Sequence, residues 1–183
     1  MSITLRQAVP ADISVLNPLI ERSARKLSAG YYSPGQIDAA IRYVFGVDSR
    51  LLEDGTYFVA QDGDRIVGCG GWSRRRTLYG GDQRPVGPSE WLDPAVDAAR
   101  VRAFFVAPDQ ARRGIGRRLL DACVDAALGA GFGRLELMAT LPGVPLYRAC
   151  GFDELERITD VLPDGTPIEF VRMGRGITRT SSE

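Results

Sequence analysis

Apolar residues recur along the chain with two different spacings, which predict short strands that alternate with amphipathic helices. Alternating or continuous short apolar runs predict strands at residues 3–7, 57–61, 65–72, 100–106, 134–139, 153–159 and 168–173. Apolar residues three or four positions apart predict helices that open at Pro10, after Ser33-Pro34, at Gly114 and at Pro145. The resulting order, β-α-α-β-β-β-α-β-α-β-β, combines hairpins with at least one βαβ crossover. It predicts a single α/β domain with a mixed, mostly antiparallel central sheet flanked by helices.

Glycine and proline residues add detail to this arrangement. Asp-Gly turns at 62–64 and 163–165 predict two hairpins, and the glycines between 68 and 71 indicate a bulge in their strand. Pro18 falls inside the first helical pattern and predicts a kink or a late start there. The segment 79–99 is rich in Gly, Pro and Asp, so we expect a long loop of the kind that often carries function.

The length and composition fit one ordinary globular domain. The chain has 183 residues, of which 44% are apolar and 25% are charged. We expect the domain to cover 1–176 and residues 177–183 to form a flexible C-terminal tail. Lysine plus arginine and aspartate plus glutamate balance at 23 each, which argues against a nucleic-acid footprint or a polybasic membrane patch.

Three observations narrow the class of protein further. The chain contains no histidine, which excludes Ser-His-Asp and Cys-His catalysis as usually built, and histidine-ligated metal sites; no metal is expected. No apolar stretch is long enough to span a bilayer, and the first residues do not resemble a signal peptide. The three cysteines lack metal-type spacing and predict no disulfide framework. A reducing cytoplasm is therefore the expected location.

The strongest chemical signal is the run Arg-Arg-Gly-Ile-Gly-Arg-Arg at 112–118, which opens a predicted helix. Cations at a helix start are unfavourable, because that end of a helix carries about half a positive charge. An anion bound among them reverses this, and the two glycines allow a ligand to approach the backbone closely. A strand and Pro108 come just before. This strand, turn and helix together predict a cradle for a phosphorylated ligand.

Three glycine-rich phosphate motifs compete for this segment. A P-loop requires a lysine and a hydroxyl residue, and neither is present here. A dinucleotide fingerprint requires a third glycine where Leu119 stands, and a place after the first strand. The third motif fits: the run from Val106-Ala107-Pro108 to Arg112-Arg113-Gly114-Ile115-Gly116 resembles the acetyl-CoA motif of the GNAT N-acetyltransferase superfamily. That motif has Arg or Gln where this chain has Ala111.

A second segment strengthens the resemblance. Tyr147, followed four residues later by Gly151-Phe152, resembles a later motif of the same superfamily. The resemblance extends from the first strand to the last and implies the GNAT fold, with strands that splay apart at an acetyl-CoA groove. It implies acetyl-CoA as co-substrate, bound by Phe104, Phe105, Val106, Arg112, Arg113, Gly114, Ile115, Gly116 and Arg117.

The resemblance also implies what each part does. The backbone at 104–106 is expected to pair with the pantetheine amides, and an N–H near Val106 to stabilise the oxyanion that forms when an amine attacks the thioester. Residues 112–117 are expected to surround the pyrophosphate. Tyr147 is expected to donate a proton to the departing thiolate, since a phenol with a pKa of about 10 stays protonated at neutral pH.

The acceptor side is less well defined by the sequence. Without histidine, a carboxylate or an ordered water is left to deprotonate the amine, and four carboxylates are unranked candidates: Glu90, Asp93, Asp97 and Glu136. Four aromatic residues are candidates for an acceptor pocket, with core or surface packing as the equal alternative for each: Tyr31, Tyr32, Trp72 and Trp91. The acceptor is expected to enter between the loop at 31–32 and the segment 79–99. The arginines at 74–76 are expected at a strand end in water.

These expectations lead to one functional hypothesis and one alternative. The hypothesis is an acetyl-CoA-dependent N-acetyltransferase, monomeric or homodimeric, that transfers the acetyl group directly to a primary amine, with a small molecule favoured over a protein. Cys150 is not expected to act as a nucleophile, because no histidine is present to activate it; Cys69 and Cys123 are expected in the core. The alternative is a non-catalytic acyl-CoA-binding sensor or interaction module, which needs no proton donor.

Overall fold

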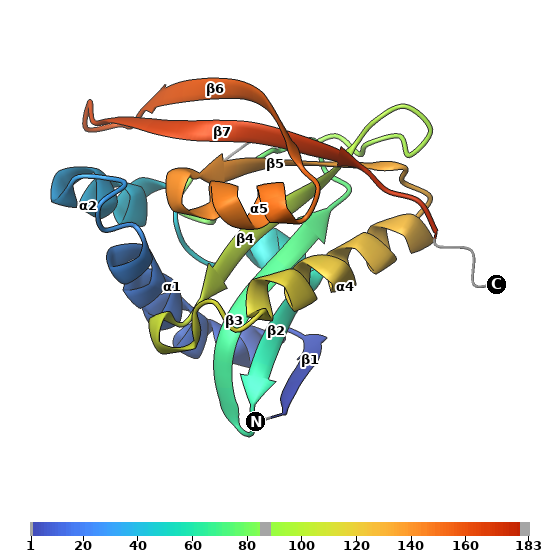
Figure 1. Ribbon diagram of the computed structural model, residues 1–183, viewed down its shortest axis with the longest axis horizontal. Coiled ribbons are helices and arrows are strands. Elements are labelled where there is room, and N and C mark those ends of the chain that lie inside the picture. The colour runs from blue at the N-terminus through green and yellow to red at the C-terminus, as the bar shows by residue number, and fades with distance from the viewer. Residues whose placement is uncertain (1, 85–88, 180–183) are drawn as a thin grey trace.

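The computed structural model describes residues 2–84 and 89–179, and a seven-stranded sheet runs through these ranges in the order β1-β2-β3-β4-β5-β7-β6. The strands are β1 (Ile3–Gln7), β2 (Tyr57–Asp62), β3 (Arg65–Ser73), β4 (Ala99–Val106), β5 (Arg134–Thr140), β6 (Asp153–Val161) and β7 (Pro167–Gly176). The α-helices are α1 (Ile13–Leu27), α2 (Pro34–Tyr43), α3 (Ser49–Glu53), α4 (Ile115–Gly129) and α5 (Val144–Ala149). Figure 1 shows α4 and α5 crossing the near face of the sheet, with α1 and α2 at its side.

The sheet is mixed, as the order of elements predicts. All its neighbouring strands are antiparallel except β4 and β5, which are parallel and joined through α4. The two predicted hairpins are β2–β3 and β6–β7. One hydrophobic cluster is built mainly from α1, α2, β2 and β3, and a second mainly from α4, β5 and β7. Cys69 and Cys123 are fully buried in these clusters, which confirms their expected place in the core.

The helices follow local signals in the sequence. Ser33 caps α2, because its hydroxyl accepts the Gln36 N–H (3.2 Å) while the Gln36 side chain accepts the Ser33 N–H (2.9 Å). The late start expected at Pro18 does not occur, since α1 begins earlier, at Ile13. The sequence did not indicate α3, which is too short to show a helical period. No helix in the described ranges is long and apolar enough to cross a membrane.

The connection from β3 to β4 contains the predicted loop at 79–99 except Ala99, which begins β4, and residues 85–88 lie outside the described ranges. The start and the end of this connection lie side by side where the Leu92 N–H donates to the Arg74 carbonyl oxygen (2.7 Å). At the other end of the chain, 180–183 of the expected tail also lie outside the described ranges. The N–H of Ile177 donates to the Gly133 carbonyl oxygen (2.9 Å), and its side chain is buried.

A bulge interrupts the pairing of β3 with β4, at the glycines where the sequence predicts one. The register shifts at 69–71, so that Gly70 faces two residues of β4, Ala103 and Phe104. Ala103 has a φ of +56°, a conformation that costs about 1–2 kcal/mol for a residue with a side chain. The hydroxyl of the buried Tyr57 donates to the Ala103 carbonyl oxygen (3.3 Å) and helps to hold the bulge in place.

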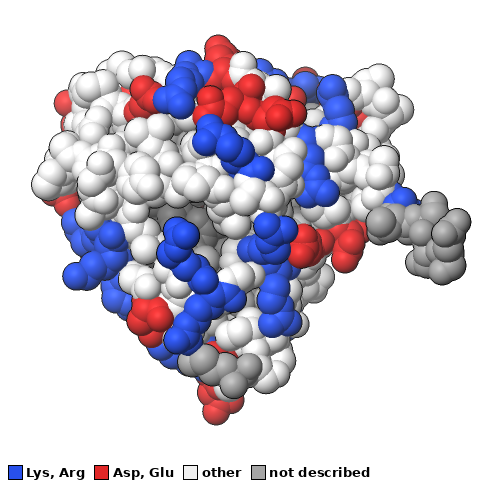
Figure 2. Space-filling model, in the orientation of Figure 1, with Lys and Arg blue, Asp and Glu red and all other residues white. Residues whose placement is uncertain are grey.

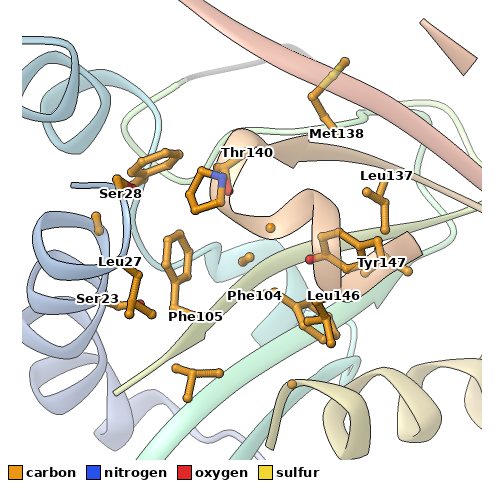
Figure 3. Close-up of a pocket in the computed structure, with 18 of the residues that line it drawn as sticks. Ser23, Leu27, Ser28, Phe104, Phe105, Leu137, Met138, Thr140, Leu146 and Tyr147 are labelled. Carbon is orange, nitrogen blue, oxygen red and sulfur yellow. The ribbon is translucent and has the colours of Figure 1, made fainter. Parts of the chain in front are cut away.

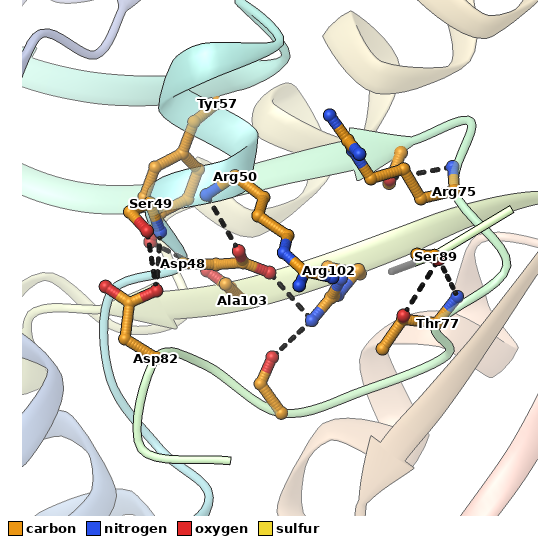
Figure 4. A network of polar contacts seen from close by, with 12 residues as sticks. Asp48, Ser49, Arg50, Tyr57, Arg75, Thr77, Asp82, Ser89, Arg102 and Ala103 are labelled. Atoms are coloured by element: carbon orange, nitrogen blue, oxygen red, sulfur yellow. Dashed lines mark hydrogen bonds and ion pairs between the residues drawn. The ribbon is translucent and has the colours of Figure 1, made fainter. Parts of the chain in front are cut away.

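A buried ion pair anchors β4 next to this bulge (Figure 4). The Arg102 guanidinium lies 2.7 Å from the Asp48 carboxylate, and both side chains are 4% exposed. Asp48 also caps α3 by accepting the Arg50 N–H (3.1 Å), and Arg102 also donates to the Gly80 carbonyl oxygen. Burial raises the pKa of Asp48 and lowers the pKa of Arg102. The pair therefore ties β4 to α3 and to the loop after β3.

We predict that Asp48→Ala lowers the free energy of unfolding by about 3–5 kcal/mol, because it leaves the Arg102 guanidinium buried without its carboxylate. The measurement is urea denaturation with the m value compared between variants. The double variant Asp48→Leu/Arg102→Met, which removes both charges, should recover most of the loss. Equal losses in the single and double variants would show that the charge pairing is not what stabilises this region.

Candidate functional site

A cleft of about 680 Å³ opens where β4 and β5 part. These strands pair only at Ala99 with Leu135 and at Arg100 with Glu136. β5 nevertheless continues to pair with β7 as far as Thr140. Beyond the two paired positions, one edge of β4 and one edge of β5 therefore face a gap, and residues from both strands line the cleft (Figure 3).

The backbone of β4 directs polar groups into this gap. In an antiparallel ladder, residue pairs that exchange hydrogen bonds alternate with pairs that do not. The Ala107 N–H donates to the Val67 carbonyl oxygen (2.8 Å), so the next pair, Val106 with Gly68, is of the non-bonded kind. The N–H and carbonyl of Val106 therefore point away from β3, toward the β5 side.

The side chains of β4 line the cleft on both faces of the sheet. Successive residues of a strand point to opposite faces. The Phe104 ring packs edge-on against Tyr147, with ring centroids 6.3 Å apart, and the Phe105 ring packs edge-on against Phe45 at 5.6 Å. Phe104 lies directly over Gly70, where a Cβ would come within 2.6 Å of its ring. The glycine therefore makes room for the aromatic wall.

The arginine–glycine run lies at one end of the cleft, and α4 begins within it at Ile115 rather than before it. Arg112 (φ +63°) and Gly114 (φ +80°) are both in the left-handed region and turn the chain into the helix. The first N–H bond of the helix runs from Arg118 to the Gly114 carbonyl oxygen (3.0 Å). The N–H groups of Ile115, Gly116 and Arg117 therefore have no partner within the helix.

The four arginines of this run are all exposed. Arg112 and Arg117 line the cleft, and Arg117 also donates to the Ala149 carbonyl oxygen (3.2 Å). Arg113 donates to the side chain of Gln110 (3.1 Å). Figure 2 shows basic side chains gathered around a hollow of this face, near the position of the start of α4 in Figure 1. Positive charge is thus concentrated at one end of the cleft in a chain whose net charge is zero.

Tyr147 lies on the wall of the cleft that α5 forms. Its side chain is largely buried, its ring packs on Phe104 and on Phe152, and its hydroxyl points into the cleft (Figure 3). Burial, and to a lesser extent the neighbouring cysteines, raises the pKa of Tyr147 above its ordinary value. The phenol therefore stays protonated, and a proton donor, at neutral pH.

The carboxylate candidates for the base lie elsewhere. Glu136 accepts hydrogen bonds from Arg100 and Arg172, both at 2.9 Å. The other three belong to the β3–β4 connection, where Asp97 accepts the Asp93 N–H (2.8 Å) and Glu90 lies 3.3 Å from an arginine. None of the four lines the cleft, and its described lining contains neither a carboxylate nor a thiol. Burial also raises the pKa of Cys150.

Of the four aromatic candidates for the acceptor pocket, one lines the cleft and three do not. Tyr31 lines the cleft, whereas the Tyr32 hydroxyl is used within the fold: it donates to the Glu169 carbonyl oxygen (2.6 Å) and accepts the Leu141 N–H (3.0 Å). Trp72 is buried against a core phenylalanine, and Trp91 is 57% exposed. Neither tryptophan lines the cleft.

Other residues at the site were not indicated by the sequence. Three aromatic rings of the cleft come from separate segments whose meeting no local pattern reveals: Phe45, Tyr79 and Phe170. The arginines after β3 were expected in water, but Arg75 is half-buried. Its Nε and Nη2 groups both donate to the Asp54 carboxylate, each at 2.7 Å. Its pKa is raised by that carboxylate.

Comparison with known proteins agrees with this architecture. The model of the acetyltransferase (GNAT) family matches residues 22–152. No curated protein matches the chain by sequence. A GCN5-related N-acetyltransferase from Rhodopseudomonas palustris is similar in structure, with 20% identity, 97% of each chain covered and a TM-score of 0.71. A phosphinothricin acetyltransferase from Sinorhizobium meliloti, in complex with acetyl-CoA, has 21% identity over 97% of this chain and 89% of that chain, with a TM-score of 0.64.

A third structure carries coenzyme A. The PaiA N-acetyltransferase from Thermoplasma acidophilum, in complex with coenzyme A, has 16% identity over 96% of this chain and 99% of that chain, with a TM-score of 0.64. These likenesses show the fold, and the family model covers well over half of the sequence. The chain therefore belongs to the GNAT family of acetyltransferases.

Proposed function

We propose that this protein uses acetyl-CoA to acetylate a primary amine, by direct transfer of the acetyl group. The observation that carries the proposal is the gap between β4 and β5, with a cationic helix start at one end and the Tyr147 hydroxyl on its wall. When bound, acetyl-CoA supplies an acetyl group that is activated as a thioester. The cleft volume of about 680 Å³, which includes the cofactor side, is typical of small-molecule sites, and a small molecule is the acceptor that we favour.

The start of α4 suits a pyrophosphate. Three N–H groups, at Ile115, Gly116 and Arg117, point out of the helix without helical partners, and the positive end of the helix dipole adds to them. A Cβ at Gly114 would meet no atom within 4 Å, so the space beside this residue is open to a ligand. We assign the pyrophosphate to this turn, with Arg112 and Arg113 supplying further charge.

The free edge of β4 suits the amide-bearing arm of the cofactor. The backbone of 104–106 has no partner in β5, and the N–H and carbonyl of Val106 face the gap. An amide chain laid along this edge would be hydrogen-bonded as an added strand is. This accounts for unpaired backbone in the interior of the sheet, where such groups are otherwise costly.

Tyr147 is the proposed general acid. In the transfer, the amine nitrogen bonds to the acetyl carbon and the carbon–sulfur bond breaks. The Tyr147 hydroxyl gives its proton to the sulfur, and the proton that leaves the nitrogen restores the hydroxyl. A neutral amine and the thioester thus give an amide and a free thiol, with no net gain or loss of a proton. The raised pKa of Tyr147 keeps the group in the donor form at neutral pH.

A non-catalytic acyl-CoA-binding module is the alternative, and the described cleft lining favours it in one respect, since it contains no carboxylate to act as a base. Thiol release from acetyl-CoA, followed with a panel of amines, peptides and water as acceptors, separates the two functions. Turnover with any amine supports the enzyme. Tight binding of acetyl-CoA without turnover on any acceptor supports the module.

A matched pair of substitutions tests the phosphate cradle. Asp and Asn are similar in size and both tolerate the left-handed conformation of Gly114, so only charge distinguishes the two variants. Gly114→Asp should weaken coenzyme A binding about 10-fold or more relative to Gly114→Asn, because it places a carboxylate beside the phosphates. Calorimetric titration measures the two affinities. Equal affinities would show that the phosphates do not bind beside Gly114.

Replacement of Tyr147 tests the acid. Tyr147→Phe keeps the ring packed on Phe104 but removes the proton donor, so kcat should fall about 10²-fold while the Kd for coenzyme A stays unchanged. Because the pKa of Tyr147 is raised, the hydroxyl stays protonated as the pH rises, and the ratio of wild-type to variant kcat should be constant from about pH 7 to about pH 9. An unaltered kcat would make Tyr147 a packing residue.

A further inference from the structure

The cleft has a second end whose lining differs from the cationic one. It lies on the face of the sheet toward which Phe105 points, where the end of α1, the residues after α2, the loop after β3 and β7 converge. Figure 3 shows Leu27 and Ser28 on the α1 side of this space and Phe105 on the β4 side. We call it the acceptor chamber and define it by Leu27, Tyr31, Phe45, Tyr79, Phe105 and Phe170.

The acceptor chamber offers no counter-charge to a cation. The charged side chains among the described residues of the whole cleft are three arginines. Arg112 and Arg117 belong to the far, cationic end, and Arg102 is paired with Asp48 at 2.7 Å. A polyamine or a lysine-rich peptide would therefore bring its additional ammonium groups into a space without an acidic partner, which is costly.

Tyr79, in the aromatic wall of the chamber, is held by contacts to its hydroxyl and to its ring. The Tyr79 hydroxyl donates to the Asp160 carboxylate (2.8 Å), the Arg84 guanidinium lies over its ring at 4.5 Å, and the ring packs against Phe170 at 5.5 Å. Asp160 in turn contacts Arg84 at 2.5 Å. The Tyr79 hydroxyl and the Asp160 carboxylate that it contacts are thus already paired, and the Tyr79 side chain lines the cleft.

On the basis of the function proposed above, we infer that the acceptor is an aromatic or branched aliphatic primary amine with no other charged group. Its apolar body would lie in the acceptor chamber against the wall that Phe45, Phe105 and Phe170 form, with its nitrogen toward the gap beside β4. Rigid aromatic walls favour such a body, because they bury apolar area at little entropic cost. A ligand without a second charge suits this chamber, because the described lining offers no acidic side chain to pair with one.

The same lining accounts for the missing base. Transfer of an ammonium group into apolar surroundings favours its neutral form, so the amine binds without its proton, which remains in the solvent. Among the described residues, the titratable groups that face the chamber are Tyr31, Tyr79 and, at the gap, Tyr147. Arg102 lines the cleft while paired with Asp48, and the Asp160–Arg84 pair contacts Tyr79. None of these is a free carboxylate.

One experiment compares two amines of the same body. Benzylamine and 4-(aminomethyl)benzylamine differ by one aminomethyl group, and we expect kcat/KM to favour benzylamine about 10-fold or more. Leu27→Glu should reverse or abolish this preference by giving the second ammonium a partner, whereas the uncharged Leu27→Gln should not. Coenzyme A affinity, measured by calorimetry, should be equal in the two variants, because Leu27 lies away from the cationic end.

The pH dependence of kcat/KM supplies an independent readout. With benzylamine it should rise with unit slope up to the pKa of benzylamine itself, and with the less basic 2,2,2-trifluoroethylamine the breakpoint should move down accordingly. A breakpoint at the same pH for both amines would reveal a base on the protein and overturn the desolvation argument.

Other outcomes separate this inference from the function on which it rests. Preference for 4-(aminomethyl)benzylamine, spermidine or a lysine peptide would overturn the acceptor class while the acetyltransferase stands. A strong preference for hexanoyl-CoA over acetyl-CoA, with no discrimination among amines, would assign the chamber to the acyl chain instead. No turnover on any amine, with coenzyme A bound tightly, would overturn the proposed function itself.

Discussion

β4 pairs with β3 along most of its length but with β5 at only two residues, so most of one edge has no partner strand in the interior of the sheet. Unpaired backbone groups are costly, and the parting persists because the surrounding contacts determine it. The Tyr57 hydroxyl holds the carbonyl of the strained Ala103, and the buried Asp48–Arg102 pair fixes the residue before it. A strand that could straighten would close the gap that contains the site.

Close glycine contacts bring the cationic turn to this gap. A Cβ at Gly68 would lie 2.9 Å from the Ile115 side chain, and one at Gly116 would lie 2.8 Å from Leu146. The first turn of α4 therefore packs directly on β3 and on α5, the helix that carries Tyr147. The free N–H groups of the helix, the free edge of β4 and the phenol consequently occupy fixed positions relative to one another, as a site that binds one extended ligand requires.

The sequence was most informative where one segment carries both the pattern and the chemistry. The glycines at 68–71, the arginine–glycine turn and Tyr147 are local signals, and the structure places the bulge, the helix start and the cleft wall at these positions. It was least informative where distant segments meet, so it did not indicate that Phe45 and Phe170 line the cleft. The base candidates lie outside the cleft lining for a related reason: a carboxylate such as Glu136 is equally suited to pairing with arginine, and sequence alone does not show which partner it takes.

The two ends of the cleft divide the chemistry of a transfer reaction between them. A phosphorylated cofactor needs charge and exposed N–H donors, and these are concentrated at the start of α4. An amine must lose its proton before it can attack, and an apolar end promotes that loss without a catalytic carboxylate. A carboxylate there would hold the amine as ammonium as readily as it would accept the proton, whereas aromatic walls such as Phe105 and Phe170 favour only the neutral form. Under the proposed function, a chain without histidine would obtain the neutral amine from an apolar end of its cleft, and would protonate the leaving group with the buried phenol of Tyr147 at the gap between the two ends.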